Sequence, residues 1–215
     1  MAETFANILL WAVPVLFAIT VRAVAYAYVA HYLGDTTPER LGRMSLNPLK
    51  HISIIGTIII PLVLYFGTNG GFAFGWAKPL PVDFSAFKDP KRSMIWLALS
   101  GPAANLGMIL IWGLALSLAS QSQGDYAEGL AYMAVAGIAI NVILCLFNLL
   151  PIPPLDGGRI LMGLLPNRLS IPFSRIEPYS MFILLGLLAT NVLNGILGST
   201  SRTLIKGIIS LFISQ

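Results

Sequence analysis

One carboxylate in this sequence follows a long apolar run and could bind a cation inside a membrane. Asp156 comes after residues 129–150, in which no side chain is charged. Between them stand Pro151, Pro153 and Pro154, which lack a backbone N–H and obstruct a continuing helix, so we predict that the chain unwinds just before the carboxylate. A carboxylate is costly to keep within a membrane, and it therefore indicates a functional site that needs a cationic partner.

Arg22 is the candidate partner, because it is the one charged residue in the apolar stretch 5–30. It and Asp156 are predicted toward the same ends of their helices, hence at similar depth, and a guanidinium can engage a carboxylate with two parallel hydrogen bonds. We expect Tyr26, one turn along the same face, to bond to the carboxylate or to backbone freed by the prolines. The alternative is that the long Arg22 side chain extends to the membrane interface.

The composition that surrounds these residues is that of an integral membrane protein. Hydrophobic residues make up 56% of the chain and charged residues 10%, and the mean hydropathy is +0.80. These values predict an all-α, polytopic helical bundle, with residues 1–215 forming a single domain in the lipid bilayer. Basic residues form no cluster that would indicate nucleic acid as a partner. Cys145 is the only cysteine, which excludes disulfides and thiolate metal sites within the chain.

Four stretches are apolar and long enough for the roughly 20 residues that a bilayer core requires. They cover residues 5–30, 94–118, 129–150 and 179–197. A short apolar helix is predicted after Asp156. The tail, residues 203–215, is either an amphipathic helix at the membrane interface or a terminal helix that packs on the bundle.

The stretch 52–66 is apolar but short, which is typical of a re-entrant segment. Outside Arg22, most basic residues fall in three segments, 40–50, 78–92 and 159–175. The positive-inside rule places all three in the cytoplasm, which requires that 52–66 enters and leaves on one side. The first span then runs inward, the second outward and the third inward, so that Asp156 arrives at the cytoplasmic end.

Between residues 68 and 93 the pattern changes to that of a short strand. Phe72, Phe74 and Trp76 alternate with small residues, and the prolines that follow predict an edge strand at the membrane. The alternative is a membrane-surface anchor built on the aromatic residues. In the second span, the small residues of Gly101-Pro102-Ala103-Ala104-Asn105 permit close helix contact, and a buried Asn105 amide needs a partner.

Taken together, these segments resemble the site-2 protease family of intramembrane zinc metalloproteases, of the short prokaryotic type. The resemblance rests on four motifs, which recur in the family's order: Leu46-Asn47-Pro48-Leu49-Lys50-His51-Ile52, Gly75-Trp76-Ala77-Lys78-Pro79, Gly101-Pro102-x-x-Asn105 and Asn148-x-x-Pro151-x-x-x-x-Asp156-Gly157. It implies a bacterial plasma-membrane enzyme that cleaves transmembrane segments of other membrane proteins. It also implies that Asn148 helps to position the scissile carbonyl, and that a substrate-binding region contains Gly75, Trp76, Ala77, Lys78 and Asn105. The alternative for Asn148 is an amide at the helix end that bonds to carbonyls freed by Pro151.

The family's zinc site, however, is altered in this sequence. The family carries His-Glu-x-x-His on its first helix and takes its third zinc ligand from the Asp-Gly motif. The positions of the two histidines hold Arg22 and Tyr26, that of the glutamate general base holds Ala23, and only Asp156 is intact. Arginine does not ligate zinc, alanine cannot accept a proton, and tyrosine is a poor ligand. We therefore predict that the chain binds no zinc and does not hydrolyse peptides, with Arg22 in the vacated metal site.

Two histidines remain, and neither restores the site. His31 and His51 are expected to have ordinary surface or packing roles. Two function classes stay open: a protease disabled by natural or engineered substitution, and a pseudoprotease that binds or holds transmembrane segments without cleavage. Concentrated loss of the three motif residues favours the first. Ser53 and Ile54, where the family tends to have Asp-Pro, indicate wider change.

Overall fold

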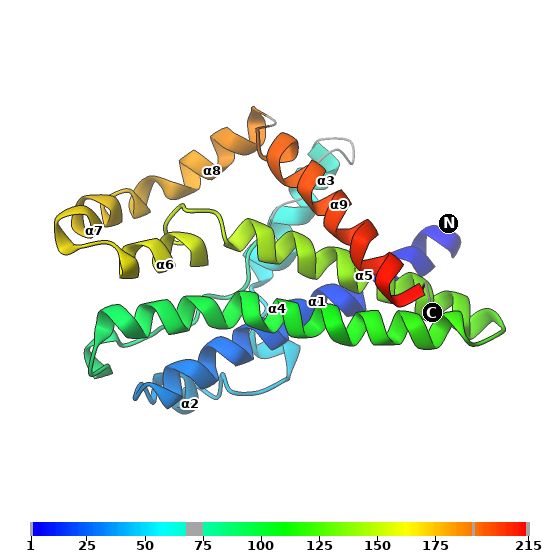
Figure 1. Ribbon diagram of the computed structural model, residues 1–215, viewed down its shortest axis with the longest axis horizontal. Coiled ribbons are helices and arrows are strands. Elements are labelled where there is room, and N and C mark those ends of the chain that lie inside the picture. The colour runs from blue at the N-terminus through cyan, green and yellow to red at the C-terminus, as the bar shows by residue number, and fades with distance from the viewer. Residues whose placement is uncertain (1, 68–74, 191, 214–215) are drawn as a thin grey trace.

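The computed structural model describes residues 2–67, 75–190 and 192–213, and over these residues it is built of helices and irregular connections (Figure 1). The α-helices are α1 (Ala2–Tyr32), α2 (Thr37–Arg40), α3 (Ile60–Gly67), α4 (Pro90–Ser120), α5 (Asp125–Asn148), α6 (Asp156–Leu164), α7 (Asn167–Ser174), α8 (Ser180–Ala189) and α9 (Val192–Ile213). Short turns of other helix types are η1 (Pro48–Lys50), η2 (Ile54–Ile59), η3 (Phe84–Ala86) and η4 (Glu177–Tyr179).

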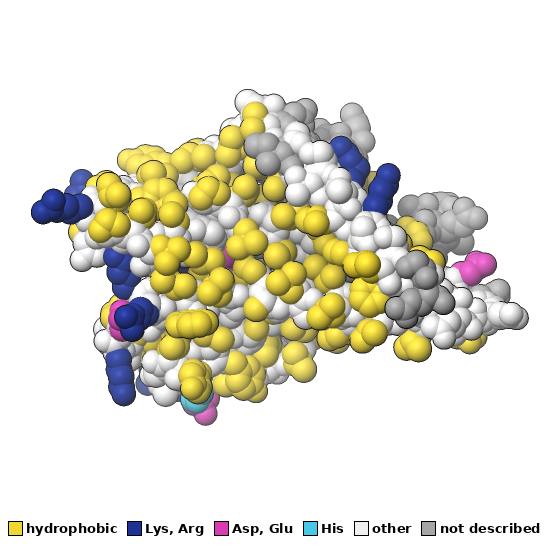
Figure 2. Space-filling view, in the orientation of Figure 1, with side chains coloured by type: hydrophobic (Ala, Val, Ile, Leu, Met, Phe, Trp, Pro, Cys, Tyr) yellow, Lys and Arg dark blue, Asp and Glu magenta, His cyan; other side chains and the backbone are white. Residues whose placement is uncertain are grey.

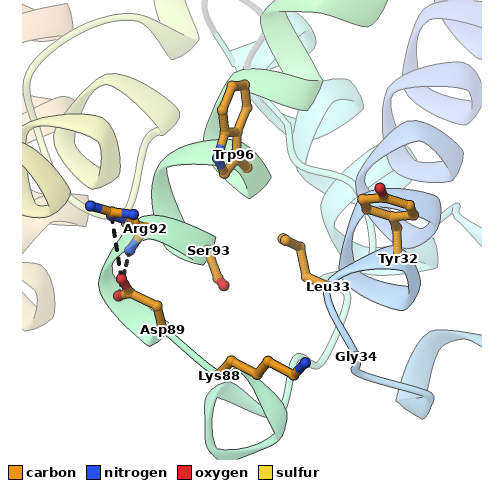
Figure 3. Close-up of a pocket in the computed structure, with 8 residues that line it drawn as sticks. All are labelled: Tyr32, Leu33, Gly34, Lys88, Asp89, Arg92, Ser93 and Trp96. Carbon is orange, nitrogen blue, oxygen red and sulfur yellow. Dashed lines mark hydrogen bonds and ion pairs between the residues drawn. The ribbon is translucent and has the colours of Figure 1, made fainter.

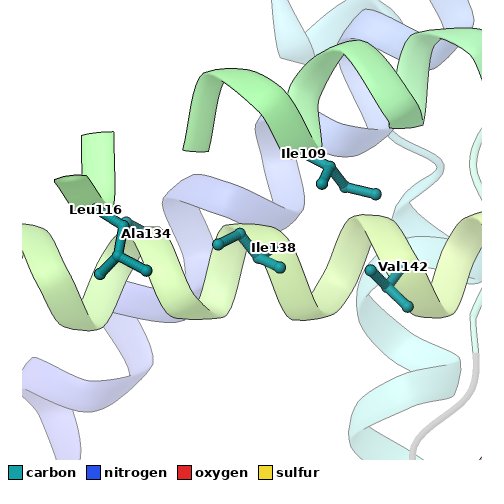
Figure 4. Close-up of a cluster of buried hydrophobic side chains, with 5 residues drawn as sticks. All are labelled: Ile109, Leu116, Ala134, Ile138 and Val142. Carbon is teal, nitrogen blue, oxygen red and sulfur yellow. The ribbon is translucent and has the colours of Figure 1, made fainter. Parts of the chain in front are cut away.

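Three helices, α1, α4 and α5, form the centre of the bundle and are long and apolar enough to cross a membrane. The spans are Leu10–Tyr32, Pro90–Ser120 and Tyr126–Asn148. Helices α4 and α5 pack against each other along their length, and α1 packs against both. A buried cluster joins α4 to α5 (Figure 4): Ile109, Leu116, Ala134, Ile138 and Val142. The first three predicted spans are thereby confirmed.

The outer face of the bundle is apolar, as expected of a protein surrounded by lipid. Leu106, Leu110, Leu114 and Leu118 follow one side of α4 and are all exposed. Figure 2 shows hydrophobic side chains across this view of the molecule, with Lys and Arg gathered at the end where α4 begins, apart from a pair over α9. A soluble monomer rarely exposes so large an apolar area. The chain is a helical membrane protein.

The predicted unwinding before Asp156 is confirmed. Helix α5 ends at Asn148 and α6 begins at Asp156, and the seven residues between them form turns. The two glycines after Asp156 make this tight return possible. A Cβ at Gly157 would overlap the Leu149 carbonyl, and one at Gly158 would overlap the Pro153 backbone nitrogen. The first turn of α6 therefore lies directly against the turn that precedes it, and α6 packs on α4.

The apolar stretch 52–66 forms η2 and α3, which together span only Ile54–Gly67 and are too short to cross a bilayer unaided. The chain leaves and returns at one place, because the Lys78 N–H donates to the His51 carbonyl at 2.9 Å. Both ends of this excursion therefore lie at the same depth. The re-entrant course of this segment stays a prediction, which labelling can test.

Cysteines placed singly at Lys50 and Lys88, in a Cys145→Ser background, are expected to react with a membrane-impermeant maleimide from the same side of the membrane. A cysteine at Gln121, in the loop between α4 and α5, provides the control for the opposite side. If the cysteines at positions 50 and 88 react from opposite sides of the membrane, the stretch 52–66 crosses the bilayer.

The predicted edge strand is not confirmed. Phe72 and Phe74 lie outside the described residues, and residues 75–83 have no regular secondary structure. Two alternate residues in this segment nevertheless make backbone hydrogen bonds like those of a strand. The Trp76 N–H donates to the Gly56 carbonyl and the Lys78 N–H donates to the His51 carbonyl, both at 2.9 Å. The Trp76 ring packs where a side chain at Gly56 would otherwise stand.

The C-terminal region differs from the prediction of one span over residues 179–197. Two helices share this stretch: α8 ends at Ala189, and α9 begins at Val192 and continues to Ile213. At the end of α8 the Thr190 hydroxyl and the Thr190 N–H both donate to the Gly186 carbonyl, at 2.9 Å and 3.0 Å. Ile205, Ile208 and Ile209 of α9 pack on the α4–α5 cluster, so the tail is a packing helix.

Candidate functional site

The predicted ion pair between Arg22 and Asp156 is present. Arg22 lies within α1 and Asp156 is the first residue of α6, and the Arg22 Nη2 donates to Asp156 Oδ2 at 2.6 Å. The carboxylate is 4% exposed and the arginine side chain 28% exposed. Arg22 stands ten residues before the end of α1, which is about 15 Å along the helix axis. The alternative, in which the guanidinium reaches the interface, is wrong.

Asn148 completes the arrangement from the last residue of α5. Its Oδ1 accepts a second hydrogen bond from Arg22 Nη2 at 3.0 Å, and its Nδ2 donates to the Leu144 carbonyl at 2.8 Å. The amide group is thus fixed by its own helix and holds the guanidinium in place. Three helices, α1, α5 and α6, contribute one side chain each to this arrangement: Arg22, Asn148 and Asp156.

Gly101 of α4 forms the fourth wall. A Cβ built at this residue would lie 2.6 Å from Asp156 Oδ2 and 2.9 Å from Arg22 Nε, both closer than real contacts allow. The absence of a side chain at Gly101 therefore makes room for the ion pair. Sequence reasoning read the Gly101-Pro102 motif as a close helix contact and missed that the contact is with the charged pair.

Tyr26 does not bond to Asp156 or to backbone near the prolines, and this part of the prediction is wrong. Its hydroxyl accepts a hydrogen bond from Arg159 Nη1 at 2.5 Å. The reason is register. Arg22 and Tyr26 are one turn apart on α1, Asp156 and Arg159 are one turn apart on α6, and the two rows meet residue to residue. The carboxylate is already engaged by Arg22, so the second cation takes the tyrosine oxygen.

The remaining residues of the altered motif and the two histidines supply no further chemistry. Ala23 is half-buried next to Arg22 and has no group that accepts a proton. His31 at the end of α1 lies 3.4 Å from Glu39 of α2. His51 is fully buried with its Nε2 2.7 Å from the Ser45 carbonyl oxygen, and burial lowers its pKa. Both histidines have the packing or surface roles expected of them.

The side chains around Asp156 do not fit a zinc ion. A catalytic zinc site has three protein ligands, drawn from His, Cys and carboxylates, and an open position for water. Here one carboxylate faces a guanidinium, which is a permanent cation and cannot ligate a metal. Among the described residues, no group of three or more His, Cys, Asp or Glu side chains could hold a metal ion.

The proposed substrate-binding residues fall in two places. In 75–78, the Trp76 and Lys78 carbonyls accept hydrogen bonds from Thr57 Oγ1 at 2.8 Å and from Arg43 Nη2 at 2.9 Å, so both residues turn their backbone toward residues 43–57. The residue between them, Ala77, has no backbone hydrogen bond to any residue in the described part of the chain. Gly75, directly before Trp76, lies so close to residue 56 that a Cβ added to it would be 2.5 Å from the Gly56 carbonyl oxygen.

Asn105 lies elsewhere, between α4 and α5. It is almost fully buried, and its Nδ2 donates to the Asn141 carbonyl at 3.2 Å. The expected partner of a buried amide is thus found on the neighbouring helix. This bond joins α4, which carries Gly101, to α5, which carries Asn148.

Comparison with known proteins relates the chain to metalloproteases. The family "Peptidase family M50" matches residues 16–190. "Putative zinc metalloprotease YwhC" of Bacillus subtilis (strain 168) is 34% identical over 183 residues, which cover 83% of this chain and 79% of the relative. "Putative zinc metalloprotease Rip2" of Mycolicibacterium smegmatis is 28% identical over 181 residues, which cover 83% of this chain and 66% of the relative. No solved structure gives a significant match.

Proposed function

Since this chain belongs to peptidase family M50, the site-2 protease family, we propose that it is a non-hydrolytic member that binds a transmembrane segment of another membrane protein without cleaving it. One observation carries the proposal. The carboxylate that the family resemblance assigns to zinc is bonded at 2.6 Å to the guanidinium of Arg22. A permanent cation therefore occupies the position of the metal, and no zinc-bound water is available to attack a peptide bond.

The residues in the other positions that the resemblance assigns to catalysis also cannot take part in hydrolysis. Ala23, in the position of the general base, cannot take a proton from water. Tyr26, in the position of the second histidine, is held by Arg159. Asn148, which the resemblance assigns to the scissile carbonyl, holds Arg22 with its oxygen and its own helix with its nitrogen. The side chains of Tyr26 and Asn148 are thus already bonded within the protein, and the Asn148 oxygen holds the Arg22 guanidinium.

Binding, in contrast, needs none of these groups. The Ala77 N–H and carbonyl, between two residues whose backbone faces residues 43–57, provide one pair of hydrogen bonds for an extended peptide added at this edge. Trp76 beside it is partly exposed and offers an aromatic surface. The partner is therefore a membrane segment that can unwind locally. By the positive-inside rule, this edge lies toward the cytoplasmic face of a bacterial plasma membrane.

A binding measurement tests this edge. The purified protein is titrated in detergent with a fluorescent single-span reporter that carries a Gly-Pro pair in its span, because such a span unwinds readily. Ala77→Pro removes the N–H and is expected to weaken binding severalfold, whereas Ala77→Val keeps the N–H and serves as the control. Equal affinity of the Pro and Val variants would refute binding by strand addition at this edge.

A second candidate function, that of a protease disabled only in its motif, is favoured by the intact Asn148, Asp156 and Gly101. The triple variant Arg22→His, Ala23→Glu, Tyr26→His restores the family motif. The unaltered chain is expected to bind the reporter and leave it intact. Cleavage of the reporter by the unaltered chain would contradict the proposal. Cleavage by the triple variant would identify a protease disabled in its motif alone. Binding without cleavage by both proteins would favour a pseudoprotease.

A further inference from the structure

A cavity of about 410 Å³ opens between the end of α1 and the beginning of α4, at the basic end of the bundle (Figure 3). It is separate from the Arg22 site and has no part in the proposed binding of a transmembrane segment. Tyr32 at the end of α1 and Leu33 just after it form one wall, and side chains from residues 88–96 form the other. Its volume is in the range of pockets that hold small organic ligands.

The polar groups of this cavity favour an anion. Lys88 and Arg92 supply two positive charges, and Asp89 supplies one negative charge, so the net charge of the lining is positive. The Asp89 carboxylate caps α4 by accepting from the Arg92 N–H at 3.1 Å and lies 3.4 Å from Arg92 Nε. Lys88 has no ion-pair partner among the residues that the structure describes. Figure 3 shows the Lys88 side chain extended toward Gly34, the Ser93 hydroxyl directed toward Leu33, and the Arg92 guanidinium turned toward Asp89.

The surroundings of the cavity favour a lipid as the source of that anion. Tyr32 is 89% exposed and Trp96 is 61% exposed, and both rings stand at the rim, where amphipathic aromatic residues lie at the headgroup level of a membrane. Beyond Trp96, exposed Leu99, Leu106 and Leu110 continue along α4 at helical spacing. An acyl chain can therefore run along α4 while its headgroup occupies the cavity.

We propose that this cavity binds the phosphate headgroup of an anionic phospholipid, with Lys88 on the phosphate, Ser93 donating a hydrogen bond, and an acyl chain along α4 from Trp96 to Leu110. The exposed Arg92 side chain turns from Asp89 to the phosphate when the lipid binds. A free phosphate ion would use the same polar groups but not the aromatic rim or the leucines. The proposal therefore predicts preference both for anionic over zwitterionic headgroups and for lipid over soluble phosphate.

Native mass spectrometry of the detergent-purified protein tests this site, by titration with phosphatidylglycerol, with phosphatidylcholine, and with soluble glycerol phosphate. Lys88→Gln/Arg92→Gln is expected to weaken phosphatidylglycerol binding by at least about tenfold, since each basic residue near a headgroup contributes substantially. Arg168→Gln/Arg175→Gln removes two exposed charges elsewhere and should change the affinity little. Lys88→Arg/Arg92→Lys, which keeps both charges, should retain binding. That result would show that substitution at these two residues preserves the fold.

Three results would overturn the proposal. They are equal affinity for phosphatidylglycerol and phosphatidylcholine, an equal loss in the Arg168/Arg175 control, and binding of glycerol phosphate as tight as that of the lipid. The last result would identify a soluble phosphate site. None of these outcomes bears on the binding of a transmembrane segment near Ala77, which the reporter measures separately.

Discussion

Replacement of Asp156 with alanine is expected to lower the free energy of unfolding by about 3 kcal/mol, because it leaves the Arg22 guanidinium within the bundle without its carboxylate. The carboxylate is 4% exposed, so little water can take its place. Arg22 keeps its bond to Asn148 and is 28% exposed, which places the expected loss at the lower end of the range for a broken buried pair. Equilibrium unfolding in mixed micelles measures the difference.

The matched control removes both charges. In Arg22→Met/Asp156→Leu no cation is stranded, and replacement of a buried pair by apolar residues of similar size is often neutral or stabilising. The double variant should therefore be more stable than Asp156→Ala. If Asp156→Ala unfolds at the same denaturant concentration as the unaltered chain, Arg22 has another partner and the pair contributes little.

Gly101→Val is expected to destabilise the protein by about 2 to 3 kcal/mol, the usual cost of adding carbon atoms to a filled site. Its side chain would enter the space held by Asp156 Oδ2 and Arg22 Nε, which lie 2.6 Å and 2.9 Å from the position of a Cβ. Arg22 and Asp156 can make room for this side chain only by moving apart, since α1, α5 and α6 enclose them. The same unfolding measurement applies.

Gly107→Val, six residues further along α4, is the control. Nothing lies within 4 Å of a Cβ at Gly107, which faces outward, so this change should have a small effect. Similar losses in both variants would show that the effect comes from valine in the helix and not from contact with the ion pair.

The ion pair could be predicted from the sequence because charges are rare in the spans. Residues 5–30 contain one cation, Arg22, and one carboxylate, Asp156, closely follows the third span. Because both were predicted at similar depth in the membrane, each had few other possible partners. The Tyr26 bond could not be predicted in the same way. It depends on the rotation of α6 about its axis, which places Arg159 opposite Tyr26. The position of Arg159, three residues after Asp156, was a signal that the sequence offered.

For the fold, long apolar runs were sufficient to predict α1, α4 and α5, and the prolines after Leu150 were sufficient to place the break before Asp156. The C-terminal helices were not predictable from hydropathy alone, because the apolar character continues across the boundary between α8 and α9. The tail allowed two readings, and the packing of Ile205, Ile208 and Ile209 on α4 and α5 decides between them. The chain's own sequence cannot show which apolar face meets protein and which meets lipid.

The zinc content of the purified protein tests the central claim most directly, that Arg22 takes the place of the metal beside Asp156. The chain is purified without chelator, equilibrated with zinc, freed of loose metal and analysed by inductively coupled plasma mass spectrometry, beside Asp156→Ala as the baseline. We predict zinc far below one ion per chain and equal to the baseline. About one zinc per chain, lost on substitution of Asp156, would contradict the account.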